Sequence, residues 1–278
     1  MDRKPPISAW TFNLKDTQHR VNLVDDTGGP NNAYPGSGLP CDSNEEFVSF
    51  MELASGLANK DNPCMIELGC HWALSSIMFR KLYPKGKSII LEPDLCSLGI
   101  GRMNFHLNNI YSDPIWGCIF PMDPSIDSFD SGFTPDLNPR AKEIDFIEEI
   151  YKKYNLKNID MLHMDIQGSE TPLINYLDQN NFFDSIIKAV FIATHNIKEH
   201  HEIVEILKKN NFNISLQQER TLLPNKPWRR EYVGGILVKE SAYKFAQERG
   251  LEVIERGGSF IVNGHDLTDG LISAYKNE

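Results

Sequence analysis

Apolar residues in this chain fall into short runs separated by segments with a helical period. The runs are rich in Ile, Leu and Met and are almost uninterrupted, which is typical of strands buried on both faces of a sheet. Between the runs, apolar residues recur every three or four positions, which predicts amphipathic helices. The pattern predicts strands at residues 64–68, 88–91, 115–120, 159–164, 186–193, 212–217 and 232–238.

The alternation of strands and helices determines the kind of sheet. Consecutive strands joined by helices require right-handed crossovers, which give a parallel sheet with helices on both faces. A long loop rather than a helix separates the last two predicted strands, so that pair is expected to be antiparallel. The chain is therefore predicted to have an α/β fold with a seven-stranded, mostly parallel sheet and an antiparallel edge pair.

Three segments are expected along the chain. Residues 1–42 are rich in Gly, Pro, Asn and Asp and show no sustained period, which predicts an irregular N-terminal arm. Residues 43–240 contain the strands and helices of the main domain. Residues 241–278 are expected to form a C-terminal appendage of one helix and a Gly-rich hairpin.

Composition narrows the classes of partner. The formal net charge of −10 argues against binding to the phosphate backbone of a nucleic acid, and small-molecule or glycan acceptors are favoured. No apolar window is long enough for a membrane span, and no signal peptide is expected. The five cysteines form no C-x-x-C pair, which fits reduced thiols and a cytoplasmic location. The sequence leaves open whether the chain forms a homo-oligomer.

The first strand ends in a turn that is suited to a nucleoside cofactor. Glu67 and Gly69 close this strand, where Gly69 permits a tight turn, and Glu92 closes the next strand, where a carboxylate can accept hydrogen bonds from ribose hydroxyls. A dinucleotide would call for a second glycine at the position of His71. The absence of that glycine favours S-adenosylmethionine over NAD. Asp123, after the third strand, is a further candidate for contact with the adenine.

A second turn of the same design follows the fourth strand, at residues 159–170. Together the segments at 67–69, 91–93 and 159–170, with Asn104 and Asn108, resemble the FkbM-type family of S-adenosylmethionine-dependent methyltransferases over residues 63–240. The family's usual form of the second turn is I-D-x-L-K-I-D-V-E-G-x-E, from which His163 and Gln167 depart. His71-Trp72-Ala73 replaces the commoner Asn-x-Gly. The resemblance implies the class I methyltransferase fold, which is Rossmann-like, and methylation of hydroxyl groups on sugars and natural products.

Asp165 and His195 are the candidates for activating an acceptor hydroxyl. They end the fourth and fifth strands, whose carboxyl ends are adjacent in a doubly wound sheet. With Asn196 they resemble the metal triad of magnesium-dependent catechol-type methyltransferases, although an imidazole ligand favours manganese over magnesium. The metal-free alternative makes His195 a general base. The structural alternatives are a helix cap for Asp165 and a carbonyl-bonded strand-end histidine for His195.

Other side chains have less specific signals. Trp228 and Arg229, in the loop before the last predicted strand, are candidates for contact with the acceptor. His163 is expected to be a packed core histidine or a support for Asp165, and His200 and His201 are expected in solvent.

The sequence thus predicts an S-adenosylmethionine-dependent O-methyltransferase. Its acceptor is expected to be a hydroxyl group of a sugar, glycan or natural product. The alternatives are an NAD-dependent oxidoreductase of Rossmann type and a methyltransferase fold that serves only as a binding module.

Overall fold

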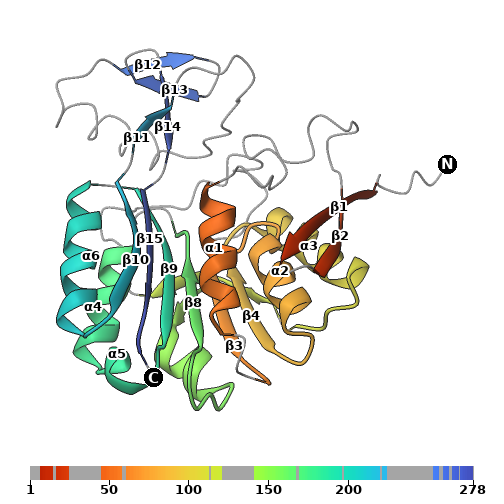
Figure 1. The fold of residues 1–278 in the computed structure, drawn as a ribbon, viewed down its shortest axis with the longest axis horizontal. Coiled ribbons are helices and arrows are strands. Elements are labelled where there is room, and N and C mark those ends of the chain that lie inside the picture. The colour runs from red at the N-terminus through yellow and green to blue at the C-terminus, as the bar shows by residue number, and fades with distance from the viewer. Residues whose placement is uncertain are drawn as a thin grey trace.

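A seven-stranded sheet forms the centre of the molecule in the computed structural model (Figure 1). The strand order is β10-β15-β9-β8-β3-β4-β5. Six of these strands run in the same direction, and β15 runs in the opposite direction. The predicted α/β fold with an antiparallel edge pair is therefore confirmed. The strands are β3 (Cys64–Leu68), β4 (Lys87–Glu92), β5 (Ile115–Trp116), β8 (Met161–Met164), β9 (Ala189–Thr194), β10 (Asn213–Gln218) and β15 (Gly270–Tyr275).

The structure describes most of the chain, but not all of it. The described residues are 7–14, 17–24, 45–57, 61–112, 114–120, 141–166, 169–195, 197–219, 221–223, 253–256, 259–262, 265–268 and 270–277.

The seventh strand is not the one that the sequence pattern suggested. The strand between β9 and β10 is β15, and residues 232–238, which were expected to pair there, lie outside the described residues. An apolar run shows that a strand is buried, but not which distant strand it pairs with. The boundary expected after residue 240 consequently does not hold for residues 270–275, which belong to the main sheet.

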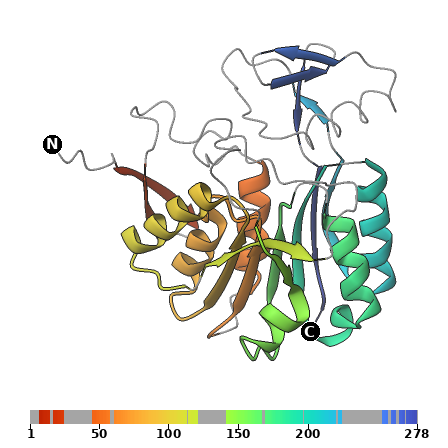
Figure 2. The same cartoon turned by 180° about the vertical axis from the view of Figure 1, so that it is seen from behind.

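Helices cover both faces of the sheet (Figures 1 and 2). Residues 65, 90 and 161 pack toward the first face, and residues 66, 89 and 162 pack toward the second, as strand alternation requires. Within the described residues, none of the helices has the length and apolar surface that a bilayer span requires. The first face carries α1 (Glu45–Ser55), α2 (Leu74–Leu82) and α3 (Leu95–Leu107), and the second carries η1 (Phe146–Lys152), α4 (Glu170–Gln179), α5 (Phe182–Ser185) and α6 (Ile197–Lys209).

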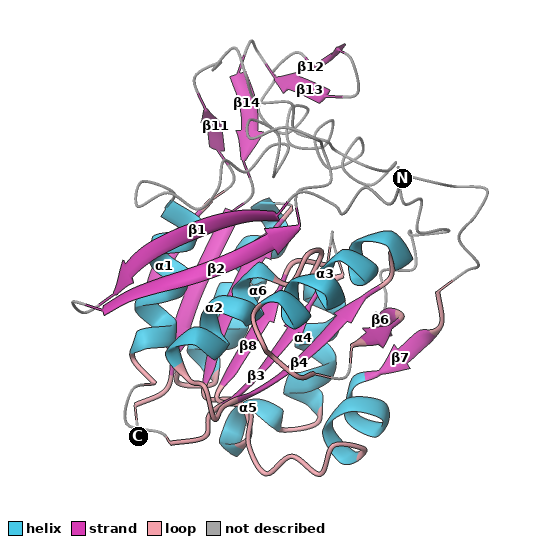
Figure 3. Cartoon of the chain, turned by 90° about the vertical axis from the view of Figure 1, so that its right-hand side faces the viewer, coloured by secondary structure: helices cyan, strands magenta, loops and turns pink. Residues whose placement is uncertain are grey.

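The N-terminal segment contains a regular hairpin, so the expectation of an irregular arm is wrong for residues 7–24. Strands β1 (Ile7–Leu14) and β2 (Thr17–Val24) pair antiparallel and lie over the helices of the first face (Figure 3). Val21 and Leu23 are buried in the same apolar cluster as residues of α2 and α3. The Gly- and Pro-rich stretch that follows dominates the composition of the arm and obscures the strand alternation before it.

The third predicted strand is split in the structure. It forms β5 in the main sheet and β6 (Cys118–Phe120), which pairs with β7 (Glu143–Asp145). The break lies at Gly117, where a Cβ atom would come within 2.4 Å of Cγ1 of Ile144. Ile144 thus belongs to β7, and η1 begins two residues later, at Phe146.

A second, four-stranded antiparallel sheet is inserted between β10 and β15 (Figure 1). β10 ends at Gln218 and the inserted sheet begins at Thr221, while its last strand ends at Thr268 and β15 begins at Gly270. The insertion therefore leaves and re-enters the main sheet at the carboxyl-terminal edge of the parallel strands. Its strands are β11 (Thr221–Leu223), β12 (Val253–Arg256), β13 (Ser259–Val262) and β14 (His265–Thr268), and the pair β12–β13 fits the expected Gly-rich hairpin.

Candidate active site

The turn after β3 is in direct backbone contact with the end of β8. Gly69 follows the last residue of β3 and has φ +74°, and its N–H donates to the carbonyl oxygen of Leu91 at 2.9 Å. On the other side, the N–H of Asp165 donates to the carbonyl oxygen of Leu68 at 3.0 Å. A Cβ atom on Gly69 would lie 1.8 Å from the carbonyl oxygen of Asp165. Only glycine fits here, for both conformation and space.

Glu67 lies buried beneath this turn and is 2% exposed. Its Oε2 atom accepts a hydrogen bond from the N–H of Ser76 in the first turn of α2, at 3.1 Å. Its Oε1 atom is 3.4 Å from Nδ1 of His163, the residue opposite it on β8. The positive end of the α2 dipole thus compensates a buried carboxylate.

Two residues of the turn have the left-handed conformation although neither is glycine. His71 has φ 46° and Ala73 has φ 60°. They stand where the FkbM-type pattern commonly has Asn and Gly, the residue types that adopt this conformation most easily. The carbonyl oxygen of the intervening Trp72 accepts a hydrogen bond from Nδ2 of Asn104, which is fully buried on α3. This hydrogen bond joins the turn to α3.

Glu92 ends β4 beside Gly69 and holds the turn from the other side. Its Oε2 atom accepts from the N–H of His71 at 2.8 Å, and its Oε1 atom accepts from the N–H of Asp94 at 2.9 Å. Burial raises the pKa of Glu92 to about 7, against the opposing effect of these two hydrogen bonds. A carboxylate at this position changes its charge near neutral pH.

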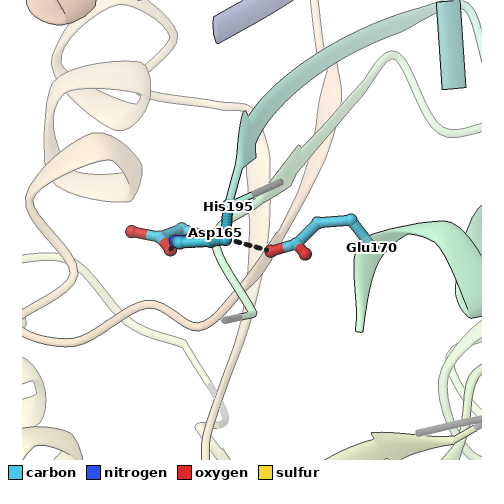
Figure 4. A group of neighbouring side chains, drawn as sticks. All are labelled: Asp165, Glu170 and His195. Atoms are coloured by element: carbon cyan, nitrogen blue, oxygen red, sulfur yellow. Dashed lines mark ion pairs between the residues drawn. The ribbon is translucent and has the colours of Figure 1, made fainter. Parts of the chain in front are cut away.

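Asp165, Glu170 and His195 form a compact cluster at the ends of β8 and β9 (Figure 4). Nε2 of His195 lies 3.3 Å from Oδ1 of Asp165, and Nδ1 lies 3.2 Å from Oε1 of Glu170. The imidazole is therefore between two carboxylates. The side chain of Asp165 is 36% exposed, whereas those of His195 and Glu170 are 4% and 1% exposed.

His200 lies immediately behind this cluster and is buried, so the expectation that it faces solvent is wrong. Its Nδ1 atom is 2.9 Å from Oγ1 of Thr194, which precedes His195 at the end of β9. Burial lowers the pKa of His200 to about 4, so the ring is neutral at physiological pH. The contact fixes the start of α6 against the strand end. His201, in contrast, is half exposed as expected and pairs with Glu219.

The structure brings together most of the residues predicted from the sequence. Four of them lie in or against the turn after β3, namely Glu67, Gly69, His71 and Glu92. Asp165 lies beside this turn and contacts His195. His163 is a packed core residue between Phe50 and Phe191, and it also faces Glu67. The predicted positions that lie outside the described residues are Asp123, Asn196, Trp228 and Arg229.

The site residue that the sequence analysis did not single out is Glu170. It begins α4 and reaches back to the turn that precedes the helix, where Oε1 accepts from the N–H of Ile166 at 2.8 Å. The only signal in the sequence was its place as the final acid of the segment that carries the family resemblance.

Residues 80–214 match the family model described as the methyltransferase FkbM domain. The predicted resemblance to the FkbM-type methyltransferases is therefore confirmed over residues 80–214. The match indicates S-adenosylmethionine as the cofactor, and the strand order of the sheet is that of class I methyltransferases. Both findings favour the methyltransferase over the NAD-dependent oxidoreductase. No protein of curated function matches the sequence.

Solved structures with similar folds are distant in sequence. One is precorrin-6y C5,15-methyltransferase from Geobacter metallireducens, with 13% identity and a TM-score of 0.46 over 89% of this chain and 96% of that chain. A second is a putative RNA methyltransferase from Pyrococcus horikoshii, with 10% identity and a TM-score of 0.42 over 84% and 81%. A third is a ribosomal protein L11 methylase from Lactobacillus delbrueckii, with 14% identity and a TM-score of 0.38 over 82% and 78%.

The close contact at Gly69 predicts a large loss of stability on adding one methyl group. Gly69→Ala forces the backbone of Asp165 away and places alanine at a positive φ, so we expect a loss of about 3 to 5 kcal/mol in the free energy of unfolding. Gly99→Ala is the matched control, because Gly99 lies within α3 and a Cβ atom there meets nothing within 4 Å. The control should gain about 0.5 to 1 kcal/mol. Urea unfolding measures both, and equal stabilities would contradict the packing described for Gly69.

Proposed function

We propose that this protein transfers a methyl group to a hydroxyl of a sugar, glycan or natural product, with His195 as the general base. The observation that supports this role is the position of the imidazole. It is buried at the end of β9, with Nε2 3.3 Å from the partly exposed carboxylate of Asp165, whose backbone carbonyl packs against the turn at Gly69. A base at this place serves an acceptor that enters from the open edge of the sheet.

The residues of the first turn fit an adenosyl cofactor. Glu92 would hold the ribose hydroxyls, and the left-handed backbone at His71 leaves its ring exposed on the surface of the turn, stacked on buried Trp72. Glu67 would act from beneath the turn, since both of its oxygens already face protein groups. The turn contains no run of free glycine N–H groups of the kind that holds a pyrophosphate, which agrees with a cofactor that lacks phosphate.

Methyl transfer requires the protein to orient the acceptor and to accept one proton from its hydroxyl group. When bound, S-adenosylmethionine supplies a methyl group on a positively charged sulfur. A sugar hydroxyl is a poor nucleophile, so a base that removes its proton during the reaction contributes typically 10²- to 10⁴-fold. The proton of the acceptor hydroxyl passes to Nε2 of His195, and the acceptor oxygen keeps the electron pair of the broken O–H bond. Asp165 would orient the acceptor hydroxyl and stabilise the imidazolium that forms.

Loss of the base should abolish turnover without loss of cofactor. We expect His195→Ala to lower the rate of methyl transfer at least 100-fold while the dissociation constant for S-adenosylhomocysteine stays within about threefold. The assay follows S-adenosylhomocysteine release over a panel of nucleotide sugars, alkyl glycosides and polyhydroxylated natural products. His201→Ala, on the exposed side of α6, is the control. A fully active His195→Ala protein would refute the proposed base. Cofactor binding by the wild type with no acceptor turned over would favour the binding module.

Titration of Glu92 should make cofactor affinity depend on pH. Ribose hydroxyls donate to the ionised carboxylate, and Glu92 has a pKa of about 7 in the described structure. Binding therefore releases a proton, and affinity for S-adenosylhomocysteine should rise up to about tenfold from pH 6 to pH 8. Glu92→Gln should bind more weakly and show no such rise, whereas Glu205→Gln, exposed on α6, should behave as the wild type. Calorimetric titration at several pH values measures this, and a flat wild-type profile would count against Glu92 as the ribose ligand.

A divalent metal is the second candidate for activating the acceptor, because Asp165, Glu170 and His195 offer ligand atoms within 4.8 Å of one another. The two carboxylates, however, make their closest contacts with opposite ring nitrogens of His195. Asn196, the third residue of the predicted triad, lies outside the described residues. The donor arrangement fits a charge-paired histidine better than a closed metal site.

Metal removal separates the two candidates. We expect the chelated, dialysed protein to retain its methyl-transfer rate within about twofold, since the base is a side chain. If chelation lowers the methyl-transfer rate tenfold or more and added Mn²⁺ restores that rate, a metal ion and not His195 activates the acceptor.

A further inference from the structure

Glu170 is a buried carboxylate for which the proposed chemistry so far has no role. Its side chain is 1% exposed, at the first residue of α4. Burying a carboxylate in protein is costly unless hydrogen bonds or an opposite charge compensate it. Its contacts therefore indicate what the burial is for.

One oxygen of Glu170 makes both of the contacts that matter. Oε1 accepts the N–H of Ile166 at 2.8 Å and lies 3.2 Å from Nδ1 of His195. The first contact ties the carboxylate to the backbone that immediately follows Asp165. Its position is thus fixed by the fold and not by solvent, and the second contact places a fixed carboxylate oxygen within ion-pair distance of Nδ1.

The two carboxylates beside His195 differ in their surroundings. Asp165 is 36% exposed and faces Nε2, while Glu170 is excluded from water and faces Nδ1. An incoming acceptor can reach only the open side of the ring. A proton held on Nδ1 by Glu170 leaves the lone pair on Nε2, on the side where Asp165 and the acceptor meet.

We propose that Glu170 is a positioning residue that fixes the tautomer and orientation of His195, with the proton on Nδ1 and the accepting lone pair on Nε2. The inference rests on the proposed role of His195 as base. Glu170 does not touch the acceptor. It holds the ring as the buried carboxylate of a Ser-His-Asp triad holds its histidine, in a reaction without a serine.

A purely structural role predicts different behaviour. An acid at the start of a helix is favoured by the helix dipole and by its bond to Ile166 alone, and this contribution would be the same whatever the state of His195. The distinguishing measurement is therefore the protonation pattern of the ring, which only the positioning role changes.

Glu170→Gln tests the inference directly. The amide keeps the size of the side chain but lacks the negative charge that favours a proton on Nδ1. If its NH₂ group takes the position of Oε1, it gives up the bond to Ile166, presents a donor to Nδ1 and favours the proton on Nε2. We expect kcat to fall about 100- to 1,000-fold, while KM for the acceptor and affinity for S-adenosylhomocysteine change less than threefold. Thr171→Ala is the control, because Thr171 is buried in the same turn of α4 and makes none of these contacts. It should leave kcat and the ring unchanged.

The second readout uses the cofactor-free protein and needs no acceptor. Nitrogen NMR of the histidine-labelled chain, assigned by comparison with His195→Gln, reports which ring nitrogen carries the proton at a pH where the ring is neutral. We expect Nδ1–H in the wild type and a gain of Nε2–H in Glu170→Gln. Should Glu170→Gln fail to fold, the wild-type spectrum still decides, since a proton on Nε2 would overturn the inference.

The two proposals fail in different ways. An active His195→Ala protein refutes the base itself. An inactive His195→Ala protein together with a Glu170→Gln protein of wild-type kcat and wild-type tautomer refutes only the role of Glu170.

Discussion

The site depends on the backbone contact between Gly69 and Asp165. In the order β8-β3-β4, the turn after β3 lies between the ends of its two neighbours, and it touches both of them through main-chain atoms. Side chains can change rotamer, but a backbone held by hydrogen bonds on both sides cannot move without disturbing the sheet. The distance between the turn after β3 and Asp165 at the end of β8 is therefore set by the backbone. Groups that bind at the turn and at Asp165 are held at that same distance.

Buried carboxylates follow from the same arrangement. Glu67 and Glu92 both end strands and both accept hydrogen bonds from backbone N–H groups, of Ser76 in one case and of His71 and Asp94 in the other. These bonds compensate part of the cost of burial and hold the turn in a conformation with two left-handed residues, each of which costs roughly 1 to 2 kcal/mol. The turn is thus strained before any ligand binds, and the hydrogen bonds to Glu67 and Glu92 hold it in that conformation. A ligand that binds there meets a turn that is already in place.

Local pattern was enough to predict the parallel strands and the two acidic turns, because each depends on a short run of residues and on the period of its apolar positions. It was not enough for β15, whose place between β9 and β10 is decided by pairing with strands far away in the sequence. The hairpin at residues 7–24 was missed because a turn-rich stretch follows it. Glu170 was missed as a site residue because an acid at a helix start has an ordinary explanation, and only the contact with His195 distinguishes it. The cytoplasmic location, the absence of a nucleic-acid partner and the O-methyl product stay predictions.

The antiparallel course of β15 has a consequence for how an acceptor could be selected. A parallel seventh strand would have to begin at the opposite edge of the sheet, so any insertion before it would have to cross the molecule. Because β15 runs the other way, the segment from Thr221 to Thr268 both leaves and returns at the edge where Asp165 and His195 lie. An insertion there can change in length and sequence without altering the turns at Gly69 and Asp165, since neither is part of the connection. The fold thus separates the turns at Gly69 and Asp165, which backbone contacts hold in place, from an inserted segment that starts and ends at the same edge of the sheet.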